Sequence, residues 1–113
     1  MEKRTASVKI KDIAQSPLKL RLVVDMVRGK DLVKALTLMK FVNKKGAKIV
    51  YKALESVAAN AQDRHQIAKE DLQVIEARVD EGKTRKTGRF ASRGRFAKIL
   101  KRRSHLILVV AEK

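Results

Sequence analysis

Apolar residues near the start of the chain recur first at every second position and then at helical spacing. Small or apolar residues alternate with polar ones over 6–10, which predicts a half-buried strand, and the stretch 13–15 is expected to turn. A Ser-Pro pair at 16–17 predicts the start of a helix, because Ser caps exposed amides and Pro suits the first helical position. We expect this helix over about 17–28, ended by Gly29 in a left-handed cap.

Two further helices are predicted from the next apolar stripes. Asp31 is expected to cap a short second helix, and Asn43 a third helix of about 18 residues. The stripe of the second helix is Leu32, Ala35, Leu36 and Met39, and that of the third is Ala47, Val50, Ala53, Leu54, Val57, Ala58 and Ala61. The many Ala positions indicate close packing against another element, and 65–70 is expected to be a connector.

The period returns to two after this connector, which predicts a strand from Leu72. One face is expected to hold Ile75, Ala77 and Val79, and the other Glu76, Arg78 and Asp80. A last strand is predicted over 104–111. These elements indicate an α+β fold in which three helices pack on a small antiparallel three-stranded sheet with a long protruding β-hairpin. We expect a single domain over 1–113.

The segment 82–103 joins the two predicted strands and contains no acidic residue. Its cations are Lys83, Arg85, Lys86, Arg89, Arg93, Arg95, Lys98, Lys101, Arg102 and Arg103. Because strands hold both ends, the segment is predicted to be an extended hairpin arm and not a disordered tail. Strands of about seven residues would reach on the order of 25 Å beyond the body.

The composition indicates that this arm binds a polyanion. Lys and Arg number 28 against 12 Asp and Glu, for a formal net charge of +16. Arg can grip phosphate with two hydrogen bonds, and Phe90 and Phe96 could stack on unpaired bases, so the pattern favours RNA. A membrane partner is not expected, because the longest purely apolar run, 106–111, is far shorter than the roughly 20 residues of a spanning helix.

A second basic surface is predicted on the body, although each of its cations also fits an ordinary solvated side chain. Its members are Lys9, Lys11, Lys19, Arg21, Arg28, Lys30, Lys44 and Lys45.

Catalytic and metal-binding patterns are missing from the sequence. There is no Cys, which excludes disulfides and thiolate chemistry. The two histidines, His65 and His105, lack metal-ligand spacing; we expect His65 in a loop and His105 in a structural role or an RNA contact. Gly29-Lys30 fails as a phosphate loop, since Val24 replaces its first Gly and Asp31 follows the Lys. We expect no enzyme, no cofactor and no metal.

Four segments in order resemble the family of bacterial large-subunit ribosomal protein twenty-two. They are Ser16-Pro17-Leu18-Lys19-Leu20-Arg21-Leu22-Val23-Val24-Asp25-Met26-Val27-Arg28-Gly29-Lys30; Leu54-Glu55-Ser56-Val57-Ala58-Ala59-Asn60-Ala61; Val79-Asp80-Glu81-Gly82; and Arg93-Gly94-Arg95-Phe96-Ala97 with Lys101-Arg102-Arg103-Ser104-His105-Leu106. The sequence departs from the family in having Lys83 where Pro is common and in lacking Pro near Phe90.

The resemblance implies an α+β body on the outside of the subunit and a hairpin that runs inward through 23S ribosomal RNA. It implies roles in RNA binding and subunit assembly, in the cytoplasm, beside neighbouring ribosomal proteins and with no homo-oligomer. It adds Ser104 to the RNA-binding return strand. The hairpin tip, which would line the nascent-peptide tunnel, is implied at Lys86, Thr87, Gly88, Arg89, Phe90, Ala91, Ser92 and Arg93.

Two other classes of function stay open at the level of sequence. A DNA-bending architectural protein can also use basic β-arms, with Phe90 as a wedge, but such wedges are often Pro and the single Pro17 lies far from the arm. An RNA-processing enzyme would need a catalytic constellation that the sequence does not display.

Overall fold

The computed structural model describes residues 4–83, 85–90 and 96–113, with backbone only for 85–90 and 96–101. In chain order the elements are β1 (Thr5–Ile13), α1 (Pro17–Val24), α2 (Leu32–Phe41), α3 (Lys45–His65), a 3₁₀ turn η1 (Lys69–Asp71), β2 (Leu72–Glu81), β3 (Arg85–Phe90), β4 (Phe96–Lys101) and β5 (Ser104–Glu112).

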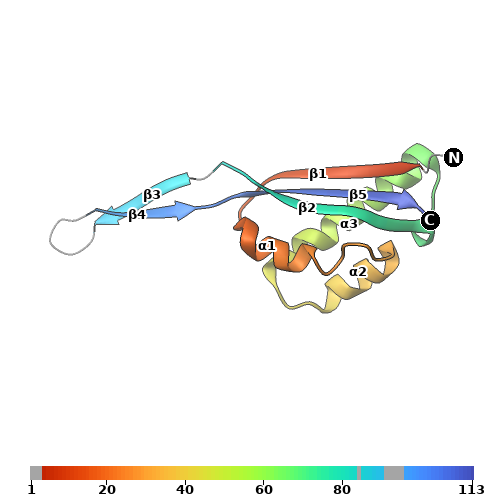
Figure 1. The fold of residues 1–113 in the computed structure, drawn as a ribbon, viewed down its shortest axis with the longest axis horizontal. Coiled ribbons are helices and arrows are strands. Elements are labelled where there is room, and N and C mark those ends of the chain that lie inside the picture. The colour runs from red at the N-terminus through yellow and green to blue at the C-terminus, as the bar shows by residue number, and fades with distance from the viewer. Residues whose placement is uncertain (1–3, 84, 91–95) are drawn as a thin grey trace.

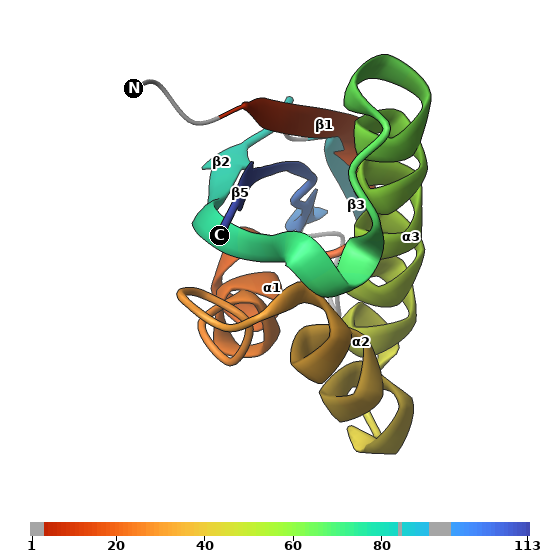
Figure 2. The same ribbon diagram turned by 90° about the vertical axis from the view of Figure 1, so that its right-hand side faces the viewer.

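A three-stranded antiparallel sheet in the order β1-β5-β2 forms the centre of the body. The three helices of the described residues gather on one face of this sheet (Figure 2). Here α3 packs mainly against β1, α1 against β2, and α2 against α3. The predicted α+β architecture is therefore confirmed.

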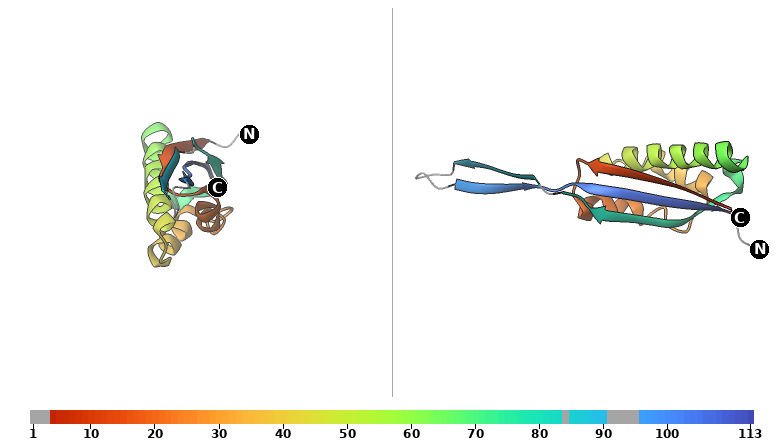
Figure 3. Two further views of the ribbon diagram at one scale, coloured as in Figure 1. Left: turned by 90° about the vertical axis from the view of Figure 1, so that its left-hand side faces the viewer. Right: turned by 90° about the horizontal axis from the view of Figure 1, so that it is seen from above.

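The strands β3 and β4 form a separate antiparallel pair that prolongs β2 and β5 away from the body (Figures 1 and 3). The molecule consequently measures 65 × 26 × 19 Å along its principal axes. This confirms the protruding hairpin. Of the tip residues implied by the family, Lys86 to Phe90 lie in β3, so the implied tip begins along a strand; Ala91, Ser92 and Arg93 lie outside the described residues.

Aliphatic side chains build the core between sheet and helices. Leu20, Leu54, Leu72, Leu106 and Leu108 are completely buried. No aromatic residue is among the buried residues of the described part of the chain. Burial of Leu and Val side chains, each worth about 1.5–3 kcal/mol, is the main stabilising contribution.

The first helix is shorter than predicted and ends at Val24 instead of near 28. Beyond it the chain continues in tighter turns, with the Met26 amide bonded to the Val23 carbonyl. Gly29 has the expected positive φ of 78°, but its N–H donates to the carbonyl of Val74 in β2. The helix ends early because this segment must turn to pair with the edge of the sheet.

Two capping predictions need correction. Asn43 does not cap α3: Lys44 occupies the cap position without a side-chain bond, and the helix runs for 21 residues instead of about 18. Asp31 does occupy the cap position of α2, but its side chain makes no capping bond. Its carboxylate instead lies 3.4 Å from Nζ of Lys113.

The end of β1, and the face of the sheet on which one residue of β2 lies, also differ from the prediction. β1 extends to Ile13, which is buried and pairs with Ser104, so the expected turn begins one residue later. In β2 a register shift between Val74 and Glu76 interrupts the alternation. Ile75 is therefore 52% exposed, and the prediction that it shares a face with Ala77 was wrong.

The predicted connector over 65–70 is partly structured. His65 is the last residue of α3 and not a loop residue, and its backbone carbonyl accepts a bond of 3.0 Å from Arg4. Gln66 follows in the left-handed conformation with φ 54°, and η1 begins at Lys69.

Candidate nucleic-acid interface

The strand pairing is interrupted where the arm leaves the body sheet. The last body pair is Glu81 with Ser104, and the first arm pair is Arg85 with Lys101. The two strands of the arm therefore form a sheet of their own, separate from the three-stranded body sheet.

Gly82 lies at this junction because the opposite backbone comes too close for a side chain. Its N–H donates to the Arg103 carbonyl at 2.8 Å. A Cβ at position 82 would lie 3.1 Å from both the carbonyl carbon and the carbonyl oxygen of Arg103. The absence of a side chain therefore allows the two strands to stay paired as they leave the body.

Three consecutive residues, Arg103 and the first two of β5, bind the base of the arm to the end of β1 and to Gln15 after it. The Ser104 hydroxyl donates to the Gln15 carbonyl at 2.6 Å, and Nη1 of Arg103 donates to the Asp12 carbonyl at 3.1 Å. The Asp12 N–H donates to Nδ1 of His105 at 3.1 Å. These bonds hold Asp12 in a left-handed conformation with φ 57°.

These contacts refine the predicted roles of the three residues. Ser104 is fully buried, so its hydroxyl serves the fold and is not on an exposed surface. His105 is half-buried and accepts a bond within the chain, which fits the structural alternative. Arg103 is half-buried, and Arg102 and Lys83 beside it are exposed.

Two arginines expected on the basic surface protect the outer edge of β2. Nε and Nη2 of Arg21 donate to the Val79 carbonyl at 3.3 and 3.0 Å. Nε of Arg28 donates to the Ala77 carbonyl at 3.0 Å, and its Nη1 lies 2.6 Å from a carboxylate oxygen of Asp25. Both side chains remain largely exposed while they cover carbonyls that could otherwise pair with another strand.

The other predicted body cations are exposed at the surface. They are Lys9, Lys11, Lys19, Lys30, Lys44 and Lys45. Nζ of Lys45 donates to the Ala14 carbonyl at 3.2 Å, which places the start of α3 beside the base of the arm. On the uncovered face of the sheet, Lys9 and Arg78 are the two Cα partners of Ile107. Arg78 is bound there to Glu76 and Asp80 at 3.2 and 3.7 Å, so net positive charge on this face lies on the β1 side.

The arm places like charges opposite each other in its ladder. Arg85 and Lys101 are Cα partners, and Gly88 is the partner of Lys98. Lys86 and Arg89 also lie on β3, while Arg93 and Arg95 lie outside the described residues. Directly opposed like charges destabilise a strand pair in isolation, and a polyanion would remove this repulsion.

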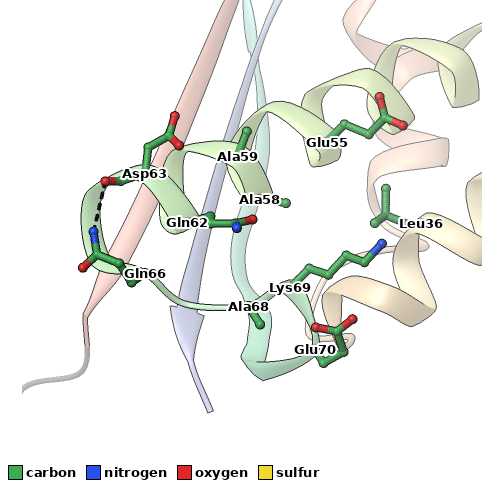
Figure 4. A pocket seen from close by; sticks show the side chains of 10 residues that line it. All are labelled: Leu36, Glu55, Ala58, Ala59, Gln62, Asp63, Gln66, Ala68, Lys69 and Glu70. Carbon is green, nitrogen blue, oxygen red and sulfur yellow. Dashed lines mark hydrogen bonds between the residues drawn. The ribbon is translucent and has the colours of Figure 1, made fainter.

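A groove lined by acidic residues lies on the body, away from the arm. A groove of about 860 Å³ lies between α3 and the loop before β2, and Glu55, Asp63 and Glu70 line it beside Lys69 (Figure 4). This groove would repel phosphate. The basic arm therefore projects from one end of the body (Figure 1), and this acidic groove lies toward the other end of α3.

An ion pair ties the chain ends together. Arg4 donates from Nε and Nη2 to the two carboxylate oxygens of Glu112, both at 3.1 Å. The hydrogen bond from Arg4 lowers the pKa of Glu112, and the hydrogen bond to Glu112 raises the pKa of Arg4. Both side chains are exposed, so the pair is a modest clamp on β1 and β5.

Within 4–83, 85–90 and 96–113, no group of three or more His, Asp or Glu residues is arranged to hold a metal ion. No helix in the same ranges is long and apolar enough to cross a membrane.

The fold and the charges together define a small α+β protein that presents a basic two-stranded arm from a helix-covered sheet. The family model described as "Ribosomal protein L22p/L17e" matches residues 8–111. The chain belongs to this family, whose members are ribosomal structural proteins and not enzymes. Its expected place in the cytoplasmic ribosome follows from this membership.

Curated relatives share most of their length with the chain. "Large ribosomal subunit protein uL22" of Dehalococcoides mccartyi strain 195 is 44% identical over 103 residues, which cover 91% of this chain and 94% of that protein. The protein of the same name from Thermus thermophilus is 46% identical over 98 residues, 87% of each chain. That of Lactobacillus delbrueckii subsp. bulgaricus is 40% identical over 108 residues, 96% of this chain and 92% of the relative.

Proposed function

We propose that this chain is a structural component of the large ribosomal subunit that binds 23S ribosomal RNA through its arm. The observation that carries the proposal is the acid-free segment 82–103, whose described backbone forms the two-stranded extension of the body sheet. The full-length relatives named as large-subunit proteins support the choice of subunit.

The body contributes the second part of the interface and fixes the arm's direction. Lys83 and Arg102 are exposed cations at the junction, where the bonds of Ser104 and His105 hold the base of the arm. Lys19 is an exposed cation of α1, whose first residue, Pro17, lies beside Arg102 and Arg103. Binding of this surface and the arm to separate RNA segments would hold those segments together, which supports a role in subunit assembly.

The end of the hairpin lines the nascent-peptide exit tunnel in this proposal. Its support is the resemblance of the return strand to the family and the length of the molecule, 65 Å, which allows a body at the surface and an arm in the interior. Neighbouring ribosomal proteins and the nascent chain are the further partners.

Sedimentation tests the proposal in cells. Tagged full-length chain should sediment with large subunits and stay bound through a second gradient. Sedimentation with chromosomal DNA only would contradict it. Competition between structured ribosomal RNA and duplex DNA distinguishes the DNA-bending alternative, because an architectural protein would prefer the duplex, whereas this chain should prefer RNA.

A further inference from the structure

A second groove lies where α2 ends and α3 begins, outside the predicted RNA-binding residues. It has a volume of about 410 Å³, and Phe41 and Tyr51 line it together with Lys40, Lys48 and Lys52. The Lys45 contact with Ala14 places the start of α3 on the arm side of the body, so this groove and the acidic groove lie toward opposite ends of the long helix.

One aromatic residue of this groove, Phe41, lies outside the core, while the other, Tyr51, packs against the edge of the core. Phe41 is 81% exposed and Tyr51 is half-buried, whereas the described core is aliphatic. The chain has only three Phe and one Tyr, and the other two, Phe90 and Phe96, are Cα partners at the end of the arm ladder. A single exposed apolar side chain is ordinary, but here the exposed ring of Phe41 lines a groove together with Tyr51 and three lysines.

The charges around the groove suit a nucleic acid. Nζ of Lys40 lies 5.8 Å from the centroid of the Tyr51 ring, and Lys40, Lys48 and Lys52 are all exposed. Among the residues that the structure describes, no acidic one lines the groove. Lys44 and Lys45 add positive charge at the start of α3, where the first turn has no acidic residue and the helix dipole is already positive.

We propose that this groove binds an unpaired RNA base, stacked on Phe41, while Lys40, Lys48 and Lys52 hold the flanking phosphates. The inference rests on the proposed function and assigns the body its own RNA contact. An unpaired base is favoured over a duplex because only an unstacked base exposes its face to an aromatic ring. Together, the aromatic face and the cations match both parts of a nucleotide.

Tyrosine emission gives a direct test, because Tyr51 is the only Tyr and the chain has no Trp. Single-stranded oligouridine should quench the Tyr51 emission of the full-length chain saturably. Heparin, a polyanion without bases, should bind without the same quench. Phe41→Ala keeps Tyr51 as the single emitter and should weaken the affinity measured by this quench by at least about fivefold, the usual loss for one base stack.

Matched controls separate stacking from general charge and from misfolding. Ile75→Ala removes another exposed apolar side chain and should leave the affinity unchanged. Lys48→Gln should weaken binding, whereas Lys69→Gln, in the acidic groove, should not. Equal quenching by heparin, or no difference between Phe41→Ala and Ile75→Ala, would overturn the inference.

A second experiment uses assembled subunits and distinguishes RNA from a protein partner. p-Benzoylphenylalanine in place of Phe41 should form photo-cross-links to ribosomal RNA in purified large subunits. Cross-links to a protein alone, or none, would overturn the inference while leaving the proposed function standing. Absence of the wild-type chain from large subunits would instead overturn the proposed function, and the emission titration would still decide the inference.

Discussion

At the scale of single residues, the base of the arm depends on close backbone contacts. Gly82 approaches the Arg103 backbone, the hydroxyl of Ser104 is used within the chain, and Asp12 is held in an unusual conformation between Arg103 and His105. These residues do not need to touch RNA to matter for binding, because they set the position from which the arm's cations extend.

Gly82→Ala should destabilise the protein by about 1 kcal/mol, because the added Cβ overlaps backbone that cannot rotate away. Urea unfolding measures the change. Lys83→Ala is the matched control: this exposed neighbour should change stability by less than about 0.5 kcal/mol. Equal stability of Gly82→Ala and the wild-type chain would show that the strands separate freely at the junction.

Glu112→Gln should lower the thermal midpoint near neutral pH and lose this effect in acid. The pKa of Glu112 is lowered in the fold, so its contribution is present above the unfolded pKa of about 4.3. The contribution is lost as pH falls through the lowered, folded pKa. Thermal scans across this range measure it, with Glu70→Gln as a control for loss of one negative charge. A difference that persisted unchanged below both pKa values would contradict the Arg4 clamp.

At the scale of elements, the body and the arm are stabilised differently. The body has an aliphatic core between sheet and helices, whereas the arm is a two-stranded ladder in which Arg85 faces Lys101. Isolated two-stranded ladders are marginally stable in water. We therefore expect the arm to depend on its anchored base and to be stabilised by a bound polyanion, whereas the body should need neither.

Replacing residues 86–100 by Asn-Gly should leave the body folded, because a two-residue turn can join the partners Arg85 and Lys101. Thermal unfolding should stay cooperative, with a midpoint equal to or above that of the wild-type chain since like charges are removed. Affinity for ribosomal RNA should fall sharply. Loss of the cooperative transition would show that the arm contributes to the body core.

Much of this organisation was predictable from local patterns, and the failures have physical causes. The helical stripes and the alternation from Leu72 reflect burial on one face, which sequence records directly. The exposed Ile75 results from a bulge, and the early end of α1 from pairing of Gly29 with Val74, both set by tertiary contacts. The spacing of apolar residues along the chain predicts neither the bulge nor the early end of the helix.

The candidate interface, too, was predictable from the sequence only in part. The cations of the arm were visible as an acid-free run, and their strands as the flanking patterns. The groove at Phe41 was missed because its residues belong to two helices and meet only in the fold. An exposed Phe among lysines at 40–52 was the available signal, but it is hidden within stretches that also predict amphipathic helices.

At the scale of the whole molecule, charge is distributed unevenly along a 65 Å axis. The arm and the groove at Phe41 are basic, and the groove between α3 and β2 contains Glu55, Asp63 and Glu70. A net charge of +16 repels itself in the free protein. In the proposed function, the basic arm and the groove at Phe41 are the parts that contact RNA, and the acidic groove is not.

RNA binding should therefore depend steeply on salt. If about 6–10 phosphates are neutralised, affinity should fall by about 10³–10⁵ between about 50 and 200 mM salt. Arg102→Gln should reduce the slope of log affinity against log salt by about one, while Lys69→Gln should leave it unchanged. A shallow slope in the wild-type chain would contradict binding through the arm.

The most direct test of the central claim is a density map of large ribosomal subunits that contain this chain. The account predicts the body at the subunit surface, β3 and β4 enclosed by 23S ribosomal RNA, and the end of the hairpin at the wall of the exit tunnel. An arm that lies in solvent or contacts only protein would contradict it.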